Sequence, residues 1–372
     1  MGNVPNLRFP EFSGEWVTKS INDLAVVIGG GTPDTTVKSY WDGEIQWFTP
    51  SEIGKNKYVD SSLRTITEVG LNNSSAKLLP PNTILLSSRA TIGECSLSLR
   101  ECATNQGFQC LVSKKCNVDF LYYLIQTKKK DLIRKSCGST FLEISANEVR
   151  KIQVSVPSDV EQQKIAELLS LIDERNATQN KIIDKLKSLI KGLPHKMAEI
   201  GLQKGCWEKV LLSTVLVERK ELNSELYTVH SVSVSEGVIN QIEYLGRSFA
   251  AKDTSNYHVA RYGDIIYTKS PTGDFPYGIV KQSYIEQPVA ISPLYGVYSP
   301  TSFETGVYLH YYFMSSVLAK NYLYPLIQKG AKNTINISNQ RFLENRIALP
   351  LKQTDRHNIA RALITIQKKL DI

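Results

Sequence analysis

The chain has 372 residues, a formal net charge of +8 and an isoelectric point near 9.0. Its composition, 42% hydrophobic and 22% charged, is typical of a globular protein, and the length predicts two domains with separate cores. No apolar run reaches the roughly 18–20 residues that span a bilayer, and the N-terminal segment lacks a signal-peptide core, so we expect a cytoplasmic protein without membrane contact. The positive charge favours a polyanionic partner without identifying it.

Six cysteines are spread along the chain without a Cys-x-x-Cys pair. This spacing favours free thiols in the protein core over a zinc site, and we expect no bound metal. The cysteines are Cys95, Cys102, Cys110, Cys116, Cys137 and Cys206.

The first globular region, residues 17–156, is predicted to be mixed α/β with short strands. Alternating or β-branched runs predict strands at 45–48, 83–86, 109–112 and 152–156, and an apolar run predicts a helix at 119–125.

Polar turns in this region are candidates for DNA contact. The glycine-rich turn 28–33 fits neither phosphate-loop pattern and is interpreted as a turn that presents Thr32. The segment 87–93 follows a predicted strand, and the pair at 105–106 could read adenine. The alternative for both is a solvated turn. The candidates are Thr32, Ser88, Arg89, Thr91, Asn105 and Gln106.

A long helix is predicted to begin at Ser158 or Asp159. Its heptad pattern is apolar at eight of ten a and d positions, and residues 159–191 would span roughly 50 Å. Such a narrow stripe favours one partner helix over a bundle core. Gly192 and Pro194 are expected to weaken the far end. The predicted interface residues are Ile165, Leu169, Ile172, Ile183 and Leu186.

The second globular region, residues 208–350, has the same predicted class. Strands are expected at 264–267, 277–280 and 295–298, and a helix at 307–314. The turn 268–273 is a candidate to present Lys269, Ser270 and Thr272 to DNA, with a solvated hairpin as the alternative. In the first globular region, basic residues at 128–130 and 134–135 predict a helix surface that is solvated or faces phosphate groups.

A second helix near the C-terminus carries the same heptad register, with Ile359, Leu363 and Ile366 as its interface residues. It stops after about two heptads. We therefore expect the distal half of the first helix to be unpaired, and covered by another subunit or by a second copy of the chain.

The chain repeats itself over nearly two hundred residues, which is too long for a solenoid repeat. Ile144-Ser145 aligns with Ile337-Ser338, and 154–157 with 347–350, at an offset of 193; Ile165-Ala166 aligns with Ile359-Ala360 at 194. Trp16 and Trp207 precede similar apolar runs. Two similar domains suit a two-part target such as duplex DNA. The flanks resemble each other more than the middles, which predicts a shared frame with two different recognition surfaces.

Catalytic signatures are lacking. Residues 274–277 resemble an amino-methyltransferase motif without its paired prolines, and 33–46 resemble a nuclease motif with glutamine in place of lysine. A fused nuclease or methyltransferase with a degenerate motif, and a coiled-coil adaptor without a DNA role, remain alternatives.

With these residues considered, the chain resembles the specificity (S) subunit of type I restriction-modification systems. The resemblance rests on 4–16 (VPNLRFPEFSGEW), 41–47 (WDGEIQW), 105–107 (NQG) and 161–166 (EQQKIA), and on their order and duplication. It departs at 355–360 (DRHNIA), where the second helix begins.

The resemblance implies two target recognition domains, related by pseudo-two-fold symmetry and separated by long antiparallel helices, that read a bipartite, asymmetric double-stranded DNA site. It implies domains at 1–156 and 200–350, a spacer helix at 157–199 and a truncated helix at 351–372. Two methyltransferase (M) subunits would bind the helices, with restriction (R) subunits joining through the complex. S-adenosylmethionine, ATP and Mg²⁺ would belong to those partners, and the chain itself would be non-catalytic and without cofactor.

Overall fold

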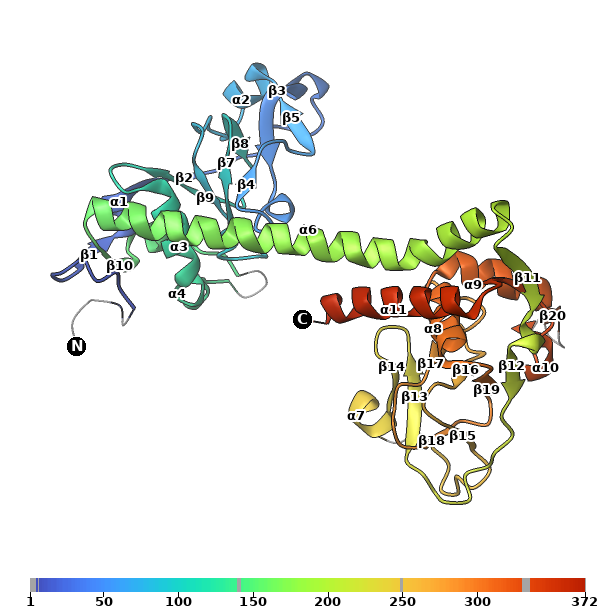
Figure 1. Ribbon diagram of the computed structural model, residues 1–372. Coiled ribbons are helices and arrows are strands. Elements are labelled where there is room, and N and C mark those ends of the chain that lie inside the picture. The colour runs from blue at the N-terminus through green and yellow to red at the C-terminus, as the bar shows by residue number, and fades with distance from the viewer. Residues whose placement is uncertain (1–4, 6, 139–141, 248–249, 330–334, 372) are drawn as a thin grey trace. The chain divides into compact units, whose positions relative to one another are not determined.

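The computed structural model describes residue 5 and residues 7–138, 142–247, 250–329 and 335–371 (Figure 1). The chain divides into two compact units, residues 1–177 and 178–372. Helix α6 (Asp159–Gln203) contributes its first part to unit 1 and its remainder to unit 2. Within the described residues, no helix is long and apolar enough to cross a membrane.

Unit 1 is a mixed α/β unit, as predicted. Its main sheet has the order β2–β9–β6–β7–β4, and a smaller sheet has the order β5–β3–β8. Helix α3 (Val118–Thr127) is followed by α4 (Lys129–Arg134), and buried residues of α3 join the core formed by the main sheet. The strands are β2 (Ala25–Gly29), β3 (Trp41–Phe48), β4 (Tyr58–Val59), β5 (Arg64–Ile66), β6 (Ile84–Leu86), β7 (Cys95–Ser98), β8 (Cys102–Thr104) and β9 (Gln109–Ser113).

Unit 2 repeats this plan, with sheets of order β12–β19–β16–β17 and β14–β13–β18–β15. Its helices include α8 (Phe303–Phe313), α9 (Ser316–Leu323) and α11 (Gln353–Leu370). The strands are β12 (Leu216–Glu218), β13 (Val229–Ser233), β14 (Gly237–Asn240), β15 (His258–Ala260), β16 (Ile265–Tyr267), β17 (Val280–Gln282), β18 (Val289–Ile291) and β19 (Gly296–Pro300).

One predicted strand of unit 2 was misplaced. The expected strand at 277–280 begins only at Val280, because Gly278 has φ +97°, and a Cβ there would lie 1.8 Å from the Thr268 carbonyl oxygen. The preceding residues therefore form a loop.

The sequence repeat corresponds to a frame that closes each unit. In unit 1, β1 (Val17–Ser20) pairs antiparallel with β10 (Gln153–Val156). In unit 2, β11 (Trp207–Leu211) pairs antiparallel with β22 (Arg346–Pro350). In both units, the first strand of the frame is thus paired with the strand that precedes a helix, which is α6 in unit 1 and α11 in unit 2.

The aligned Ile-Ser pairs have the same structural role in both frames. Ile144 and Ile337 are buried. Ser145 caps α5 (Ala146–Arg150) and Ser338 caps α10 (Asn339–Phe342), each accepting a hydrogen bond from a backbone amide three residues later. Residues 330–334, which precede the second pair, lie outside the described residues. An apolar anchor followed by a helix cap therefore explains why this dipeptide recurs.

The aligned tryptophans also have similar surroundings. Trp16 meets Phe120 of α3 edge-on with ring centroids 6.4 Å apart, and Trp207 meets Tyr308 of α8 edge-on at 5.6 Å. Each tryptophan thus packs its frame against the corresponding helix.

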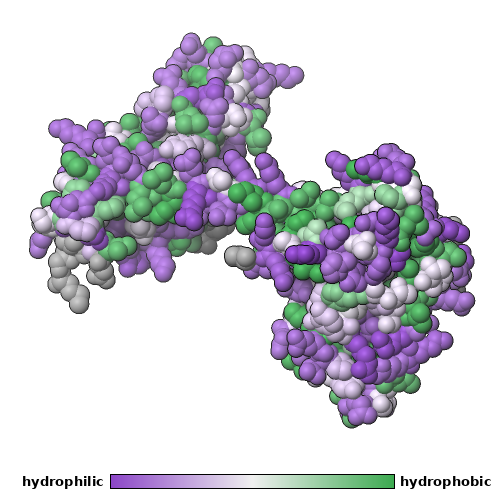
Figure 2. Space-filling view, in the orientation of Figure 1, coloured by the Kyte–Doolittle hydropathy of each residue, from purple (hydrophilic) through white to green (hydrophobic). Residues whose placement is uncertain are grey.

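Helix α6 continues through Gly192 and Pro194 to Gln203. Its start packs on the unit 1 core through Ala166, and its end packs on the unit 2 core through Ile190 and Ala198. Between these parts, residues 171–182 are exposed, and Figure 2 shows hydrophobic side chains over the middle of the helix.

The predicted unpaired part of this helix was placed at the wrong end. Helix α11 shares the unit 2 core with the C-terminal part of α6, beside which it lies in Figure 1. The exposed stretch is therefore 171–182, in the N-terminal half of the helix, because α11 runs back from the end of unit 2.

The expectation that all cysteines lie in the core was partly wrong. Cys95, Cys102, Cys110 and Cys116 are buried, whereas Cys137 and Cys206 are exposed. Burial raises the pKa of Cys110 to about 12, so this thiol stays protonated.

Candidate nucleic-acid interface

The glycine-rich turn of unit 1 lies against the end of β8. A Cβ at Gly30 would lie 1.9 Å from the Asn105 carbonyl oxygen, so the close approach requires glycine. The Gly31 amide donates to the Thr104 carbonyl at 2.8 Å, and the indole of Trp47 donates to the Gly31 carbonyl at 2.9 Å. The turn is thereby fixed at both its amide and its carbonyl.

This close approach brings two predicted contact residues together. The Thr32 hydroxyl donates to Oε1 of Gln106, and the Gln106 side chain is otherwise exposed. Asn105 is used locally, because its Oδ1 accepts from the Gly107 amide at 2.9 Å. Gln106 is therefore better placed than Asn105 to meet a base edge.

The turn after β6 joins the same region. The Ser88 amide donates to the Gly107 carbonyl at 2.8 Å, and the Ile144 amide donates to the Ser88 carbonyl at 3.1 Å. Ser88 is fully buried, and its hydroxyl has no partner among the described residues. Ser88 therefore holds the turn from within and does not present its hydroxyl at the surface.

Arg89 is displayed at the surface on this turn. Its guanidinium lies 2.9 Å from the Glu143 carboxylate, and the two side chains are 42% and 36% exposed. Ala90 has φ +52°, which turns the chain sharply after the arginine. Thr91 is exposed and its hydroxyl donates to Ser87 Oγ at 3.1 Å. An incoming phosphate or guanine would compete with Glu143 for Arg89.

Sequence reasoning missed Glu143. It lies more than fifty residues from Arg89 and belongs to no motif, so only its position directly before the repeated Ile144-Ser145 pair marked the segment. It also missed Arg64, whose guanidinium carbon lies 3.5 Å from the ring centre of Trp41.

The corresponding turn of unit 2 is longer and differently anchored. The Thr268 hydroxyl accepts from the Ile279 amide at 3.0 Å, and Thr272 forms a bridge with Phe275. Ser270 and Thr272 are exposed, whereas Lys269 is half-buried. The turn therefore presents hydroxyl groups at its tip and an ammonium group near its base.

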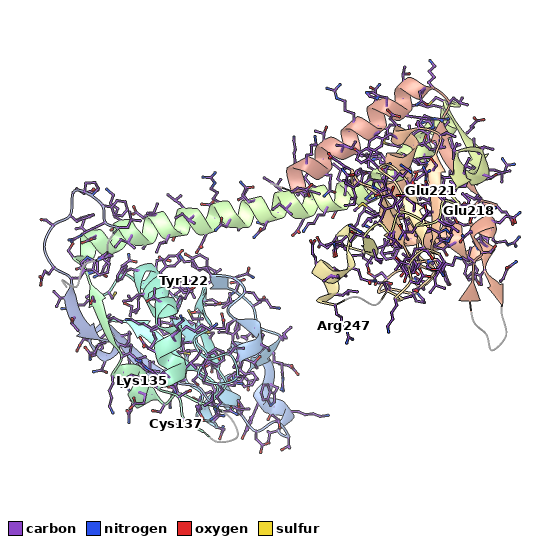
Figure 3. The ribbon with its side chains drawn as sticks, turned by 90° about the horizontal axis from the view of Figure 1, so that it is seen from below. Tyr122, Lys135, Cys137, Glu218, Glu221 and Arg247 are labelled. Carbon is purple, nitrogen blue, oxygen red and sulfur yellow. The ribbon has the colours of Figure 1, made fainter. Side chains whose placement is uncertain are left out.

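Lys269 has a carboxylate in its environment. Burial lowers the pKa of Lys269, and the negative charge of Glu218 opposes this shift. Glu218, labelled in Figure 3, accepts a hydrogen bond from the Asn339 side-chain amide at 2.7 Å. Unit 2 thus uses a lysine beside Glu218 where unit 1 uses an arginine on Glu143.

The basic helix surface of unit 1 is largely neutralised. Lys129 pairs with Glu94, Arg134 with Asp131 at 2.8 Å, and Lys135 approaches Glu148 at 4.0 Å. Such exposed pairs contribute little to stability and leave a surface without directed base contacts.

The predicted helix-interface residues fall into two groups. Ile359 and Leu363 are buried and Ile366 is partly buried in the unit 2 core. The residues of α6 remain partly or largely accessible, with Ile172 45% exposed. The accessible group is Ile165, Leu169, Ile172, Ile183 and Leu186.

In the described part of the chain, no group of three His, Cys, Asp or Glu side chains is arranged to hold a metal ion. Asp34, the first residue of the nuclease-like pattern, accepts hydrogen bonds from the amide and hydroxyl of Thr36.

Comparison with known proteins relates part of the chain to one family. Residues 13–188 match the type I restriction modification DNA specificity domain. The chain is 39% identical over 180 residues to the type I restriction enzyme MjaIX specificity subunit of Methanocaldococcus jannaschii, covering 46% of this chain and 42% of that protein. Residues 13–188, a little under half of the chain, thus resemble the type I DNA specificity domain. The predicted resemblance is confirmed.

Further relatives agree. The type I restriction enzyme EcoR124I/EcoR124II specificity subunit of Escherichia coli is 31% identical over 175 residues, covering 45% of this chain and 43% of that protein. The chain thus spans less than half the length of these curated relatives. The S subunit of M. genitalium has a similar fold, with a TM-score of 0.56 at 14% identity, covering 100% of this chain and 93% of that one. The predicted α/β fold class is confirmed, and the named relatives are specificity subunits.

Proposed function

We propose that this chain is the DNA sequence-specificity subunit of a type I restriction-modification enzyme and that each unit reads one part of a bipartite, asymmetric site. The match of residues 13–188 to a DNA specificity domain carries this proposal. The repeated frame supports it, because a second unit with the same frame and a different set of turns suits a second, different DNA word.

In unit 1, Arg89 and Gln106 are the side chains proposed to contact bases. Arginine reads guanine and glutamine reads adenine through paired hydrogen bonds. Thr32 and Thr91 would contact phosphate or orient these side chains, while Asn105 and Ser88 would hold the turns in place. In unit 2, Lys269, Ser270 and Thr272 would take the equivalent part.

The partners are proposed to dock on the helical parts. The apolar stripe of α6 and the two frames offer similar surfaces to two M subunits, and R subunits would join through the complex. A second copy of the chain could instead cover residues 171–182 of α6. S-adenosylmethionine, ATP and Mg²⁺ would be held by those partners, and this chain would catalyse no step.

Duplex binding under increasing salt tests the proposal. The chain, purified with its cognate M subunit, is mixed with a randomised duplex pool, and the retained sequences are read after selection. We expect two short fixed words separated by unspecified bases, with affinity that falls steeply between about 50 and 200 mM salt. The proposal would be overturned if the chain retained duplexes without sequence preference, or retained no duplex at any salt concentration. Turnover by the chain alone with Mg²⁺ or S-adenosylmethionine would favour an enzyme instead.

A further inference from the structure

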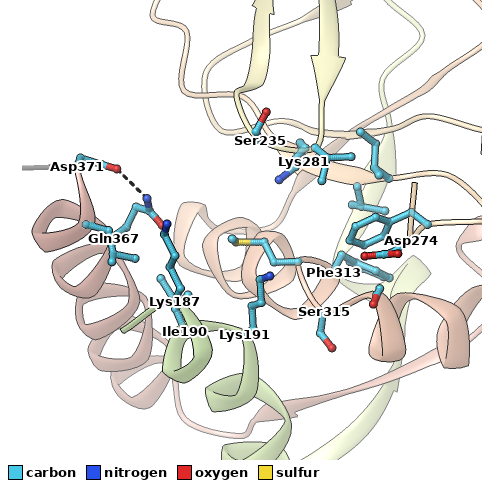
Figure 4. A pocket seen from close by; sticks show the side chains of 17 residues that line it. Lys187, Ile190, Lys191, Ser235, Asp274, Lys281, Phe313, Ser315, Gln367 and Asp371 are labelled. Carbon is cyan, nitrogen blue, oxygen red and sulfur yellow. Dashed lines mark hydrogen bonds between the residues drawn. The ribbon is translucent and has the colours of Figure 1, made fainter. Parts of the chain in front are cut away.

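Unit 2 contains a hollow of about 530 Å³ that the proposed DNA turns do not use. Its lining comes from α6, β17, the segment between α8 and α9, and the end of α11 (Figure 4). Its charged and hydroxyl side chains are Lys187, Lys191, Lys281, Asp274, Asp371, Ser235, Ser315 and Ser316.

Lys281 is the unusual member of this lining. It lies on β17 and is only 6% exposed, and no hydrogen bond or ion pair within the described residues involves its ammonium group. Figure 4 shows the end of this side chain directed into the hollow. Burial lowers the pKa of Lys281 to about 8. A buried cation without a counter-charge is costly, so an anion in the hollow would stabilise it.

Unit 1 shows how a largely buried lysine is ordinarily satisfied. Lys57 lies 2.7 Å from a carboxylate oxygen of Asp119, and it donates to the hydroxyls of Ser170 at 2.7 Å and Tyr123 at 3.2 Å. The corresponding protein groups are missing around Lys281 in the described structure.

Other groups around the hollow also suit an anion. The positive charge of Lys191 is close enough to contribute to the lowered pKa of Lys281. Helix α9 begins here, with Ser315 as its N-cap and Ser316 in its first turn. The first amides of a helix have no partner within the helix and favour negative charge.

Two carboxylates limit the charge of the hollow. Asp371 accepts a hydrogen bond from Gln367 at 2.8 Å, and Asp274 lines the opposite part (Figure 4). Three lysines against two aspartates leave an excess of one positive charge. This favours a small anion over a long acidic peptide.

We propose that this hollow in unit 2 binds a phosphate group through Lys281, Lys191 and the first turn of α9. The phosphate could belong to a DNA backbone, in which case the inference rests on the proposed function, or to a free phosphate compound. Either source has the tetrahedral oxygens that ammonium groups and helix amides bind.

Isothermal titration of the full chain with inorganic phosphate tests the proposal. We expect saturable binding that weakens at least tenfold in Lys281→Met and measurably in Lys191→Gln, which changes an exposed residue and leaves the core intact. Lys320→Gln, an exposed lysine of α9 outside the lining, is the matched control and should bind like the wild type. Circular dichroism establishes that each variant is folded.

Competition with duplex DNA separates the two sources. If duplex DNA displaces the bound phosphate, and variants of unit 1 still bind that duplex, the hollow binds the DNA backbone. Duplex binding without displacement would assign it to a free phosphate compound. Absence of saturable phosphate binding, or equal binding by wild type, Lys281→Met and Lys191→Gln, would overturn the proposal whether or not the chain binds DNA.

Discussion

The two units close the same frame with different polar anchors. In unit 1, Glu161 is 1% exposed on its side chain and accepts two hydrogen bonds of 2.7 Å from Arg8, and Trp16 donates to it at 3.3 Å. The aligned residue of unit 2 is Asp355, whose carboxylate forms no ion pair with the residues that the structure describes. Unit 1 thus has a buried carboxylate paired with Arg8, whereas at the start of α11 Arg356 donates to the Pro350 carbonyl at 2.9 Å and His357 lies 3.3 Å from Glu304.

This difference distinguishes the features that both frames share from the features that belong to one unit only. Both frames keep paired end strands, a buried isoleucine and a capping serine. The anchors and the turns differ because they act within one unit only. Substitutions at aligned positions should therefore have unequal effects, which makes the comparison testable.

The largest expected effect is on the stability of unit 1. Glu161→Ala should lower its free energy of unfolding markedly, because it leaves the Arg8 guanidinium without its carboxylate. Asp355→Ala should lower the stability of unit 2 by less than about 0.5 kcal/mol. Hydrogen exchange resolved by peptide measures both units in one sample. Equal losses in the two units would refute the assignment of different anchors.

The next effect is on DNA affinity. Arg89→Gln should weaken binding of the cognate duplex by roughly 10–100-fold and relax the sequence at one position, because a base-reading arginine is lost. Lys269→Gln should weaken binding less and lower the salt dependence by about one phosphate contact. Anisotropy titrations at several salt concentrations measure both. Arg134→Gln, on the ion-paired helix surface, should bind normally; if it weakened binding as much as Arg89→Gln, the proposed turn would not be the contact.

A smaller effect concerns pH and unit 2. The folded-state pKa of Lys281 is about 8 and the ordinary value is 10.5. At a pH between these two values, Lys281 is protonated in the unfolded chain and largely deprotonated in the folded chain. The stability of unit 2 should therefore rise with pH across this window, by at most about 1.4 kcal/mol per pH unit. Denaturant unfolding at pH 8 and pH 9.5 measures the slope. Lys281→Met should reduce it, and an unchanged slope in that variant would exclude Lys281 as its cause.

The smallest effect distinguishes two glycines of α6. Gly192 has open space where the methyl group of an alanine would lie, so Gly192→Ala should stabilise unit 2 by about 1 kcal/mol. A Cβ at Gly201 would lie 2.0 Å from the Trp207 ring, so Gly201→Ala should destabilise the frame. Thermal unfolding should show shifts of opposite sign, and a shared sign would contradict the packing of Trp207 on the helix.

Periodicity and repetition predicted most of the strands and helices, because the local spacing of apolar residues indicates which of the two a segment forms. The aligned Ile-Ser pairs and tryptophans located the frame before any contact was known. Spacing did not reveal that Ser88 is buried, that Arg89 pairs with Glu143 or that Lys281 lacks a carboxylate, because each depends on segments far apart in the sequence. The sequence also did not show which half of α6 packs against α11, since the heptad pattern of α11 fits either half.

The methylome of cells that carry this chain with its M subunit tests the central claim most directly. Cells lacking only this chain serve as the reference, and a strain with Arg89→Gln completes the set. The account predicts one split methylated motif that is lost with the chain, and a change confined to one of its two words in the variant. A methylome that is the same with and without the chain would contradict the account.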